Sequence, residues 1–345
     1  MKTPPPIKTI EHQTDGSEAP NPFAMLTGEL SSALSLYWSA AARVLNGSGI
    51  TLRDPTAEFF SLENNFFSAL FLYSYYRANI APPRRILYAA INQCLRGMVT
   101  GCDNILDDEY KKTLETDLPP QATRIRSILD IMVSDRVLFE LLLQSDQTNG
   151  LTHETVLAVS SASLCALAGS GKQEASEEGG IEQRLAPETV LCAVHHYKTG
   201  LLFQAPWAVP AAMESLQNSV VTPLLEALYR IGIGCQIMDD MVDLPADLRQ
   251  GRHNYVASLI YHDPDPAEWA RLQAELASDR GREQGIDLLA QFEHARRAAA
   301  QSARYFLEAR TRVLFATPHQ YLVEPTISFL AGRLRADRFL ADLAS

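Results

Sequence analysis

Apolar residues recur at intervals of three and four along almost the whole chain, which is the spacing of amphipathic α-helices. Proline, glycine and asparagine mark the points where this pattern stops. The pattern predicts helices over residues 24–45, 55–79, 82–116, 122–144, 152–167, 187–213, 223–244, from 266 onward, 281–313 and, as two short helices, 318–343. Alternation of apolar and polar residues never extends beyond a few positions. We therefore expect an all-α protein folded as a single large helical bundle.

The segments between the predicted helices differ in composition. Residues 1–22 are rich in proline and polar side chains, which predicts a disordered N-terminal tail ahead of one domain over residues 23–345. Gly169–Gln183 is rich in glycine, serine and glutamate, and we expect a surface loop there. Pro206 predicts a kink within its helix, and Pro245 predicts that its helix bends or ends.

Composition narrows the class of protein. The 345 residues are 46% hydrophobic and 21% charged, which is globular and long enough to bury a large core. A net charge of −11 argues against a nucleic-acid partner held by charge. The five cysteines form no CxxC pair, so we expect buried free thiols in a reducing, cytoplasmic compartment. We also expect no signal peptide and no transmembrane segment.

Four aspartates follow an apolar stretch in the sequence GIGCQIMDDMVDLPADLRQGR of residues 232–252. On a helix, Asp239 and Asp243 lie one turn apart, and Asp240, Asp243 and Asp247 also share a face. Like charges at this spacing repel each other, so a cluster of this kind is often a place for a bound cation, and Mg2+ prefers oxygen ligands. Taken alone, the cluster is equally consistent with a solvated acidic helix end.

A second acidic cluster ends the predicted helix over residues 82–116. Asp103 and Asp107 share one face of the helix, and Asp108 follows Asp107 directly in sequence. Arg96 lies two turns before Asp103 on the same face. If the two acidic helices face each other, their carboxylates converge at one mouth of the bundle. Such an arrangement holds several Mg2+ ions and, through them, a diphosphate whose loss the ions promote. Two clusters therefore favour a metal site over a pair of solvated helix ends.

Basic and donor residues accompany the two clusters. Lys198 lies in the sequence HHYKTG on an otherwise apolar helix, so it needs an anionic partner, either a diphosphate or a structural carboxylate. His195 and His196 have no metal-ligand spacing and are interpreted as packing or surface residues. After the central cluster, donors that either close over a phosphate or cap the next helix are Arg249, Arg252, His253, Asn254 and Tyr255.

These motifs resemble those of the class I isoprenoid synthase superfamily, which includes trans-prenyl diphosphate synthases, squalene and phytoene synthases and class I terpene cyclases. QIMDDMVD resembles the second Asp-rich motif of the trans-prenyl synthases, and KTGLLF resembles their Lys-Thr motif. DNILDDE is similar to the first motif of the squalene and phytoene branch, and DLRQGR to the tail of that branch's second motif. The resemblance covers residues 55–260 approximately and implies the all-α isoprenoid synthase fold, a helical bundle around a central apolar cavity.

The resemblance also implies roles for individual residues. Mg2+ ions would be held by Asp103, Asp107, Asp108, Asp239, Asp240 and Asp243. A small-molecule prenyl diphosphate would be contacted by Arg96, Lys198, Arg249, Arg252 and Tyr255, with Asp103, Asp107, Asp240 and Lys198 as the catalytic set. Either Gly169–Gln183 or Asp247–Tyr255 would close over the site. A homodimer is common in the superfamily and is expected here.

Aromatic side chains on the helix after residue 55 are candidates to wall the cavity, because aromatic faces stabilise a carbocation. The candidates are Phe66, Phe67, Phe71, Tyr73, Tyr75 and Tyr76, of which Phe67 and Phe71 are taken as substrate-binding. For any single one of them, packing in the core is the alternative interpretation.

The chain departs from the chain-elongating synthases at two places. The basic trio expected before the first motif is absent from SLENNFFSALFLYSYYR, and Lys111-Lys112 stands where an Arg pair is expected. We therefore predict an enzyme that ionises an allylic prenyl diphosphate with Mg2+ and then cyclises or quenches the cation, as terpene synthases do. The alternatives are a prenyltransferase that joins an allylic diphosphate to isopentenyl diphosphate or another acceptor, and a non-catalytic regulatory partner of a prenyl synthase.

Overall fold

The computed structural model describes residues 20–107, 110–149, 152–277 and 288–341. All regular elements of this part of the chain are helices, and one isolated bridge pairs Leu52 with Thr116. The prediction of an all-α fold is therefore confirmed. Most of the predicted tail lies outside the described residues, but Asn21 caps the first helix by accepting a hydrogen bond from Phe23 N at 3.0 Å.

The chain forms two compact units. The N-terminal unit comprises the described residues from 20 to 167 together with Ala205–Val221, and the C-terminal unit comprises Ala168–Gln204 and the described residues from 222 onward. A compact unit need not fold independently, so the prediction of one domain over residues 23–345 stays a prediction. The central apolar cavity also stays a prediction.

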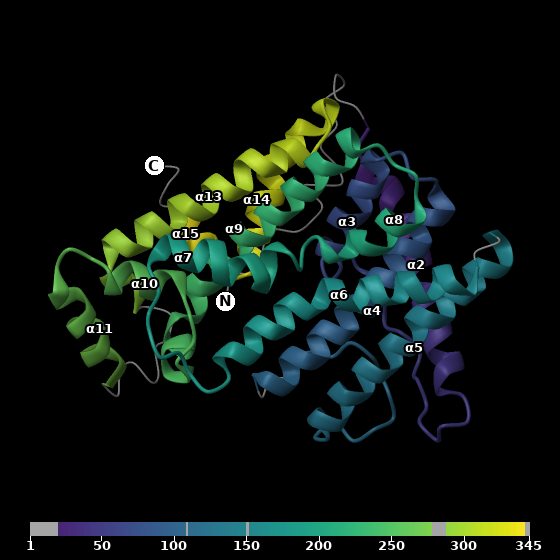
Figure 1. Ribbon diagram of the computed structural model, residues 1–345, viewed down its shortest axis with the longest axis horizontal. Helices are drawn as coiled ribbons and strands as arrows, with labels where there is room; N and C mark the ends of the chain where they lie inside the picture. The colour runs from purple at the N-terminus through teal and green to yellow at the C-terminus, as the bar shows by residue number, and fades with distance from the viewer. Residues whose placement is uncertain (1–19, 108–109, 150–151, 278–287, 342–345) are drawn as a thin grey trace. The chain divides into compact units, whose positions relative to one another are not determined.

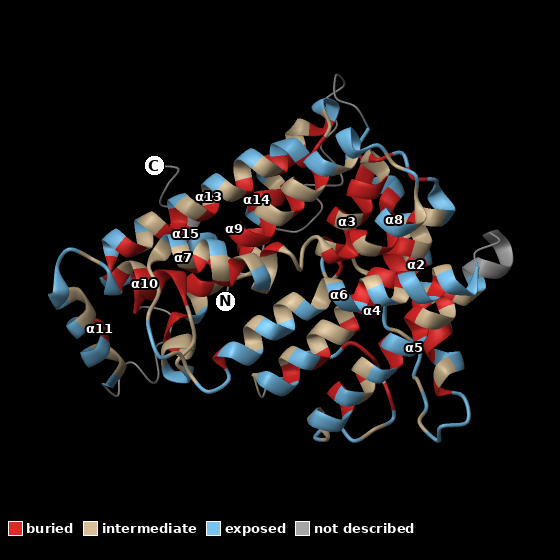
Figure 2. Ribbon diagram, in the orientation of Figure 1, coloured by how far each residue is buried: buried red, intermediate tan, exposed pale blue. Residues whose placement is uncertain are grey.

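The N-terminal unit is organised around helix α4. Its elements are α2 (Pro22–Leu45), η1 (Ala57–Phe60), α3 (Phe66–Arg77), α4 (Pro82–Leu106), α5 (Thr123–Asn149), the first part of α6 (His153–Glu177), η3 (Ala205–Trp207) and α8 (Ala208–Met213). Helix α4 packs against α2, α3 and α5 (Figure 1). Figure 2 shows buried and exposed residues alternating along α2 and α4, as expected of amphipathic helices.

A glycine sets how closely α4 approaches α5. A Cβ atom added at Gly101 would lie 2.8 Å from the backbone oxygen of Ser127 and 2.6 Å from the side chain of Ile131. A larger residue would therefore push α5 away from the last turns of α4. Because Asp103 and Asp107 occupy these turns, the close packing fixes the backbone that carries them.

Buried hydrogen bonds hold η3 against α3 and α4. The Tyr75 hydroxyl donates to Pro206 O at 2.6 Å and accepts from Asn92 Nδ2 at 2.9 Å. Trp207 Nε1 donates to Ser74 Oγ at 2.9 Å. All of these side chains are buried and cannot bond to water. The hydrogen bonds within the protein take the place of those to water.

The C-terminal unit is built from shorter helices beside one long helix. Its elements are the end of α6, α7 (Pro187–Thr189), the π-helical η2 (Val190–Gly200), α9 (Asn218–Gln250, which begins in the N-terminal unit), α10 (Tyr255–Tyr261), α11 (Pro266–Ala277), η4 (Leu289–Gln291), α13 (Glu293–Leu314), η5 (Thr317–Leu322), α14 (Val323–Arg333) and α15 (Asp337–Ala341). Helix α10 contacts α7, η2, α11 and α13, and α13 also contacts α14 and α15.

Helix α9 is the apolar centre of this unit. A Cβ atom added at Gly232 would lie 2.7 Å from Thr199 O and 2.9 Å from the ring of Phe203, so glycine permits α9 to pass close to η2. Among the described helices, α9 alone is long and apolar enough to cross a membrane, with a hydropathy of 1.2 over its most apolar window. Half of that window is buried inside the protein, as in the core helix of a soluble protein.

Two predicted helices are shorter in the structure, because asparagine side chains turn the chain. The helix over residues 55–79 is replaced by η1 and α3, since Asn65 Nδ2 donates to the carbonyls of Phe59 at 2.7 Å and Ser61 at 2.9 Å. The helix over residues 82–116 ends at Leu106, and Asn104 bonds both the N–H and the carbonyl of Lys111. Such bonds compete with helical ones.

The prolines also act differently from the prediction. The helix over residues 187–213 is broken after Gly200, before Pro206, where the wide turns of η2 end. Helix α9 continues through Pro245 to Gln250, so it does not end at that proline. A π-helical run of 11 residues is unusual, since π-turns mostly occur singly.

The surface loop predicted over Gly169–Gln183 is wrong for most of its length, because α6 continues as helix to Glu177. Contacts of its polar side chains with η2 and with the segment after α9 outweigh the weak helix propensity of glycine and serine. The prediction of buried cysteines holds for Cys94 and Cys235, but the other three are exposed because their helices turn them away from the core.

Replacing Tyr75 with Phe tests the bonds that hold η3. The change leaves the buried amide of Asn92 and the carbonyl of Pro206 without the hydroxyl, so we expect the free energy of unfolding to fall by about 1–3 kcal/mol. Urea titration followed by circular dichroism measures it. Tyr261→Phe, at an exposed tyrosine, is the control and should change it by less than about 0.5 kcal/mol; an equal loss in both variants would contradict the assignment.

Candidate functional site

The first acidic motif occupies the last turn of α4. Asp103 and Asp107 are half-buried one turn apart, and the N–H of Asp107 closes the helix on the carbonyl of Asp103 at 2.8 Å. Both carboxylates therefore stand at a helix C-terminus, where the helix dipole disfavours negative charge, so a cation beside them would be stabilising. Asp108 lies outside the described residues.

Arg96 connects this helix to the start of α3. Its Nη1 donates to Asn65 Oδ1 at 2.9 Å. A guanidinium from α4 is thus placed at the segment of residues 61–77 in which the local sequence carries no basic trio. Positive charge can reach a segment from a residue distant in sequence.

The aromatic residues of α3 divide into two groups. Phe66, Tyr73 and Tyr75 are at most 2% exposed and belong to the core, which is the alternative interpretation raised for them. Phe67, Phe71 and Tyr76 are half-buried, and Phe67 and Phe71 lie four residues apart on one face. These two, taken from the sequence as substrate-binding, remain candidates for that role.

The three aspartates of the second motif lie in different environments on α9. Asp239 is half-buried and Asp243, one turn later, is exposed, whereas Asp240 is buried with 2% of its surface exposed. The repeat of four residues thus turns Asp239 and Asp243 towards solvent and Asp240 into the unit. The sequence assigned all three to metal.

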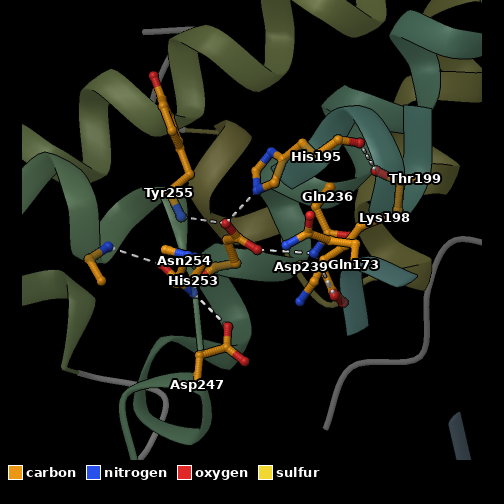
Figure 3. A network of polar contacts seen from close by, with 12 residues as sticks. Gln173, His195, Lys198, Thr199, Gln236, Asp239, Asp247, His253, Asn254 and Tyr255 are labelled. Carbon is orange, nitrogen blue, oxygen red and sulfur yellow. Dashed lines mark hydrogen bonds and ion pairs between the residues drawn. The ribbon is translucent and has the colours of Figure 1, made fainter. Parts of the chain in front are cut away.

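The carboxylate of Asp240 accepts three hydrogen bonds, which come from three segments (Figure 3). One oxygen accepts from His195 Nε2 at 2.9 Å and from the backbone N–H of Tyr255 at 2.5 Å, and the other accepts from Gln236 Nε2 at 3.0 Å. Because a carboxylate can only accept, His195 donates this hydrogen bond through an N–H at Nε2. Asp240 therefore joins η2 and the start of α10 to α9.

Asn254 extends this network to the end of α9. Its Nδ2 donates to Asp240 O at 2.8 Å and to Asp247 Oδ2 at 2.7 Å, and its Oδ1 accepts from Ala257 N at 3.0 Å (Figure 3). Asn254 thus caps α10, which was one of its two predicted roles. Burial and the nearby Asp240 raise the pKa of Asp247 well above its usual range.

Lys198 is paired with carboxylates of α6. Its Nζ lies 3.4 Å from Glu174 Oε1 and 3.3 Å from Glu177 Oε2, and its side chain is 10% exposed. Burial lowers the pKa of Lys198, but the nearby carboxylates of Glu174, Glu177, Asp240 and Asp247 together outweigh burial and raise the pKa above its ordinary value. The structural carboxylate expected as the alternative partner of Lys198 is present, so in this structure the lysine is charged and held.

The remaining donors of the predicted site lie around the end of α9. Arg249 is exposed in the last turn of α9, and Arg252 is half-buried in the following loop. The ring of Tyr255 is buried, and its hydroxyl pairs with Ser302 Oγ on α13 at 3.1 Å. Tyr255 therefore contacts the acidic motif through its backbone N–H and not through its phenol.

Several residues of this network were not identified from sequence. Glu177 lay in the segment taken as a loop, and His195 was interpreted as packing or surface. Gln236 carries a local signal, since it precedes Asp240 by one helical turn. Glu177 carries none, because its partners Lys198 and His253 lie 21 and 76 residues away.

The donor set fits a metal ion that is completed by its substrate. Among the described residues, no three His, Cys, Asp or Glu side chains gather into a metal site. Mg2+ is commonly held by one or two carboxylates together with substrate phosphates, and the pairs Asp103–Asp107 and Asp239–Asp243 offer such carboxylates. The pairs belong to different units, so the sharing of one set of ions by both stays a prediction.

No protein-family model and no curated protein matches the chain. Several solved structures do match the chain. The polyprenyl synthase of Caulobacter crescentus CB15, complexed with calcium and isoprenyl diphosphate, is 14% identical, with a TM-score of 0.63 over 92% of this chain and 99% of that one. The geranylgeranyl pyrophosphate synthetase of Pyrococcus horikoshii Ot3 is 17% identical, with a TM-score of 0.60 over 90% and 98%. Heptaprenyl diphosphate synthase of Staphylococcus aureus is 13% identical, with a TM-score of 0.58 over 88% and 97%.

These likenesses show the fold. The chain has the all-α fold seen in these polyprenyl and geranylgeranyl diphosphate synthases, so the resemblance stated from its motifs is confirmed at the level of the fold. The main functional prediction, ionisation followed by terpene-synthase-like cyclisation, is wrong, because the similar structures are those of prenyltransferases. It rested on the missing basic trio and on Lys111-Lys112 in place of the expected Arg pair, which are two local departures of the sequence.

Asp240→Asn tests the central role of this carboxylate in the C-terminal unit. An amide nitrogen would face N–H donors, so we expect the free energy of unfolding, measured by urea titration without metal, to fall by about 2–4 kcal/mol. Glu226→Gln, at a part-exposed position on the same helix, should change it by less than about 0.5 kcal/mol. Unchanged stability of Asp240→Asn would show that the three bonds are not the anchor we describe.

Proposed function

We propose that the protein is a Mg2+-dependent prenyltransferase that joins an allylic prenyl diphosphate to isopentenyl diphosphate or to another prenyl acceptor. The observation that carries this proposal is a carboxylate pair one turn apart at the end of an apolar helix in each unit. The fold shared with the prenyl synthases supports it.

Each residue of the proposed site has a defined task. Asp103, Asp107, Asp239 and Asp243 would hold Mg2+, while the buried Asp240, which accepts three hydrogen bonds, would position its neighbours. Arg96, Lys198 and Arg252 would contact the diphosphate. When bound, Mg2+ would neutralise charge on the leaving diphosphate and so assist cleavage of the C–O bond.

The apolar residues of the site would exclude water from the reacting carbon. Phe67 and Phe71 present half-buried rings on one face of α3. A carbocation beside an aromatic face is stabilised by about 0.5–2 kcal/mol. Water would also stabilise the cation, but it would react with it. The role of these rings is thus to hold the allylic group until the acceptor attacks.

A purified sample with Mg2+ tests the activity and separates the alternatives. We expect pyrophosphate release from geranyl, farnesyl or geranylgeranyl diphosphate to depend on added isopentenyl diphosphate, with a longer prenyl diphosphate as product. Asp107→Ala and Asp239→Ala should each reduce turnover by at least about 100-fold, because each removes a proposed metal ligand. Release is measured with a coupled phosphate assay and products by mass spectrometry.

Glu178→Gln is the matched control for loss of one negative charge, since Glu178 is exposed after the end of α6. It should keep turnover within about twofold of the wild type. No metal-dependent release with any donor and acceptor would favour the regulatory partner, the remaining alternative. Equal activity of wild type, Asp107→Ala and Asp239→Ala would refute the metal assignment.

We further propose that the protein forms a homodimer through the N-terminal unit. Residues 155–167 of α6 contain no charged side chain, and exposed Leu157 and Leu164 share one face. On α5, Ile125, Ile128 and Met132 form a second exposed apolar stripe. Uncharged exposed faces of this kind are typical of interfaces, and a second copy is the partner that presents the same surface in every sample.

Leu164→Glu tests the homodimer. A charge at this 70% exposed leucine would have to be buried in the interface, so we expect the dimer dissociation constant to rise by at least about tenfold in sedimentation equilibrium. Tyr305→Glu, at a tyrosine that is 67% exposed in the C-terminal unit, is the control and should leave it unchanged. A monomeric wild type, or a dimer insensitive to Leu164→Glu, would contradict the proposal. The expected location of the enzyme is the cytoplasm.

A further inference from the structure

Two carboxylates of α6 face one ammonium group of η2. Glu174 and Glu177 lie one turn apart, and Lys198 Nζ is 3.4 Å from the first and 3.3 Å from the second. Ser170 Oγ, on the same face of α6, donates to Lys198 O at 3.2 Å. The lysine that the proposed function assigns to a diphosphate is therefore already neutralised by the protein.

The two carboxylates are held differently. The side chain of Glu177 is 2% exposed; its Oε1 accepts from Gln173 Nε2 at 2.8 Å and its Oε2 accepts from His253 N at 2.9 Å. It thus ties α6 to the loop after α9, whether or not Lys198 moves. The side chain of Glu174 is 24% exposed and lies at the outer edge of the cluster. Water can replace Lys198 at Glu174 far more readily than at Glu177.

We propose that Glu174 and Glu177 are internal counter-ions of Lys198, with Glu177 positioning the ammonium and Glu174 competing with a diphosphate for it. The proposal rests on the proposed function, in which Lys198 contacts the diphosphate. An ammonium group has three N–H donors, so it can keep its bond to Glu177 while exchanging Glu174 for phosphate oxygens.

The arrangement has a physical reason in each state. A buried lysine without an anion nearby is costly, so the carboxylates keep it charged and in place before substrate arrives. Once a diphosphate with its Mg2+ is bound, Lys198 no longer needs the negative charge of Glu174. Moving the Glu174 side chain away into solvent costs part of the free energy of diphosphate binding. The pair therefore lowers affinity for the diphosphate and favours release of pyrophosphate after the reaction.

Titration calorimetry with inorganic pyrophosphate and Mg2+ tests this inference on the full chain. We expect Glu174→Gln to bind pyrophosphate about twofold to fivefold more tightly than the wild type, because the partly exposed carboxylate of Glu174 no longer competes for Lys198. Glu178→Gln removes the same charge four residues away and should leave the affinity unchanged. Weaker or unchanged binding by Glu174→Gln, or equal tightening by Glu178→Gln, would overturn the inference.

A double-mutant cycle with Lys198→Met separates this inference from the proposed function. If Lys198 contacts the diphosphate, Lys198→Met alone should weaken pyrophosphate binding by at least about tenfold. In that background, the further change Glu174→Gln should have no effect, since its effect acts through the lysine. Undiminished binding by Lys198→Met would refute the assigned contact itself. A weakened Lys198→Met together with persistent tightening by Glu174→Gln would refute the counter-ion role alone.

Discussion

The buried carboxylate of Asp240 is the constraint on which the acidic end of the C-terminal unit depends. It accepts hydrogen bonds from His195, Gln236 and the N–H of Tyr255, which belong to η2, α9 and α10. A buried carboxylate is tolerated only when its oxygens are satisfied, so these three segments must keep their positions together. As a result, the neighbouring Asp239 and Asp243 are presented on a fixed backbone.

Close helix packing supplies the second constraint, and it takes the same form in both units. Gly101 lets α4 approach α5 immediately before Asp103, and Gly232 lets α9 approach η2 seven residues before Asp239. Interiors packed at this density transmit any displacement, so a side chain at either glycine would move the acidic helix end. Both acidic motifs thus sit on closely packed helices, which suits residues that must hold ions with little reorganisation.

The extent to which sequence predicts this molecule follows from how local each feature is. Helical periodicity is local, and so the all-α fold and the acidic pairs could be read directly from spacing. Helix ends were missed where a side chain bonds a distant backbone group, as Asn104 does at Lys111. The helical state of residues 169–177 was missed because it depends on contacts of Glu177 with Lys198 and His253. The preference for cyclisation rested on two short stretches of sequence, whereas the likeness to the prenyl synthases extends over the whole fold.

The central claim is that Asp239 and Asp243 bind metal whereas Asp240 holds the surrounding segments in place. A crystal structure with Mn2+ and inorganic pyrophosphate tests this claim most directly. The anomalous signal of Mn2+ locates each ion independently of the model of the side chains. Our account predicts ions beside Asp239 or Asp243, with Asp240 still bonded to His195 and Tyr255 N. An ion coordinated by Asp240, with its bond to His195 broken, would contradict it.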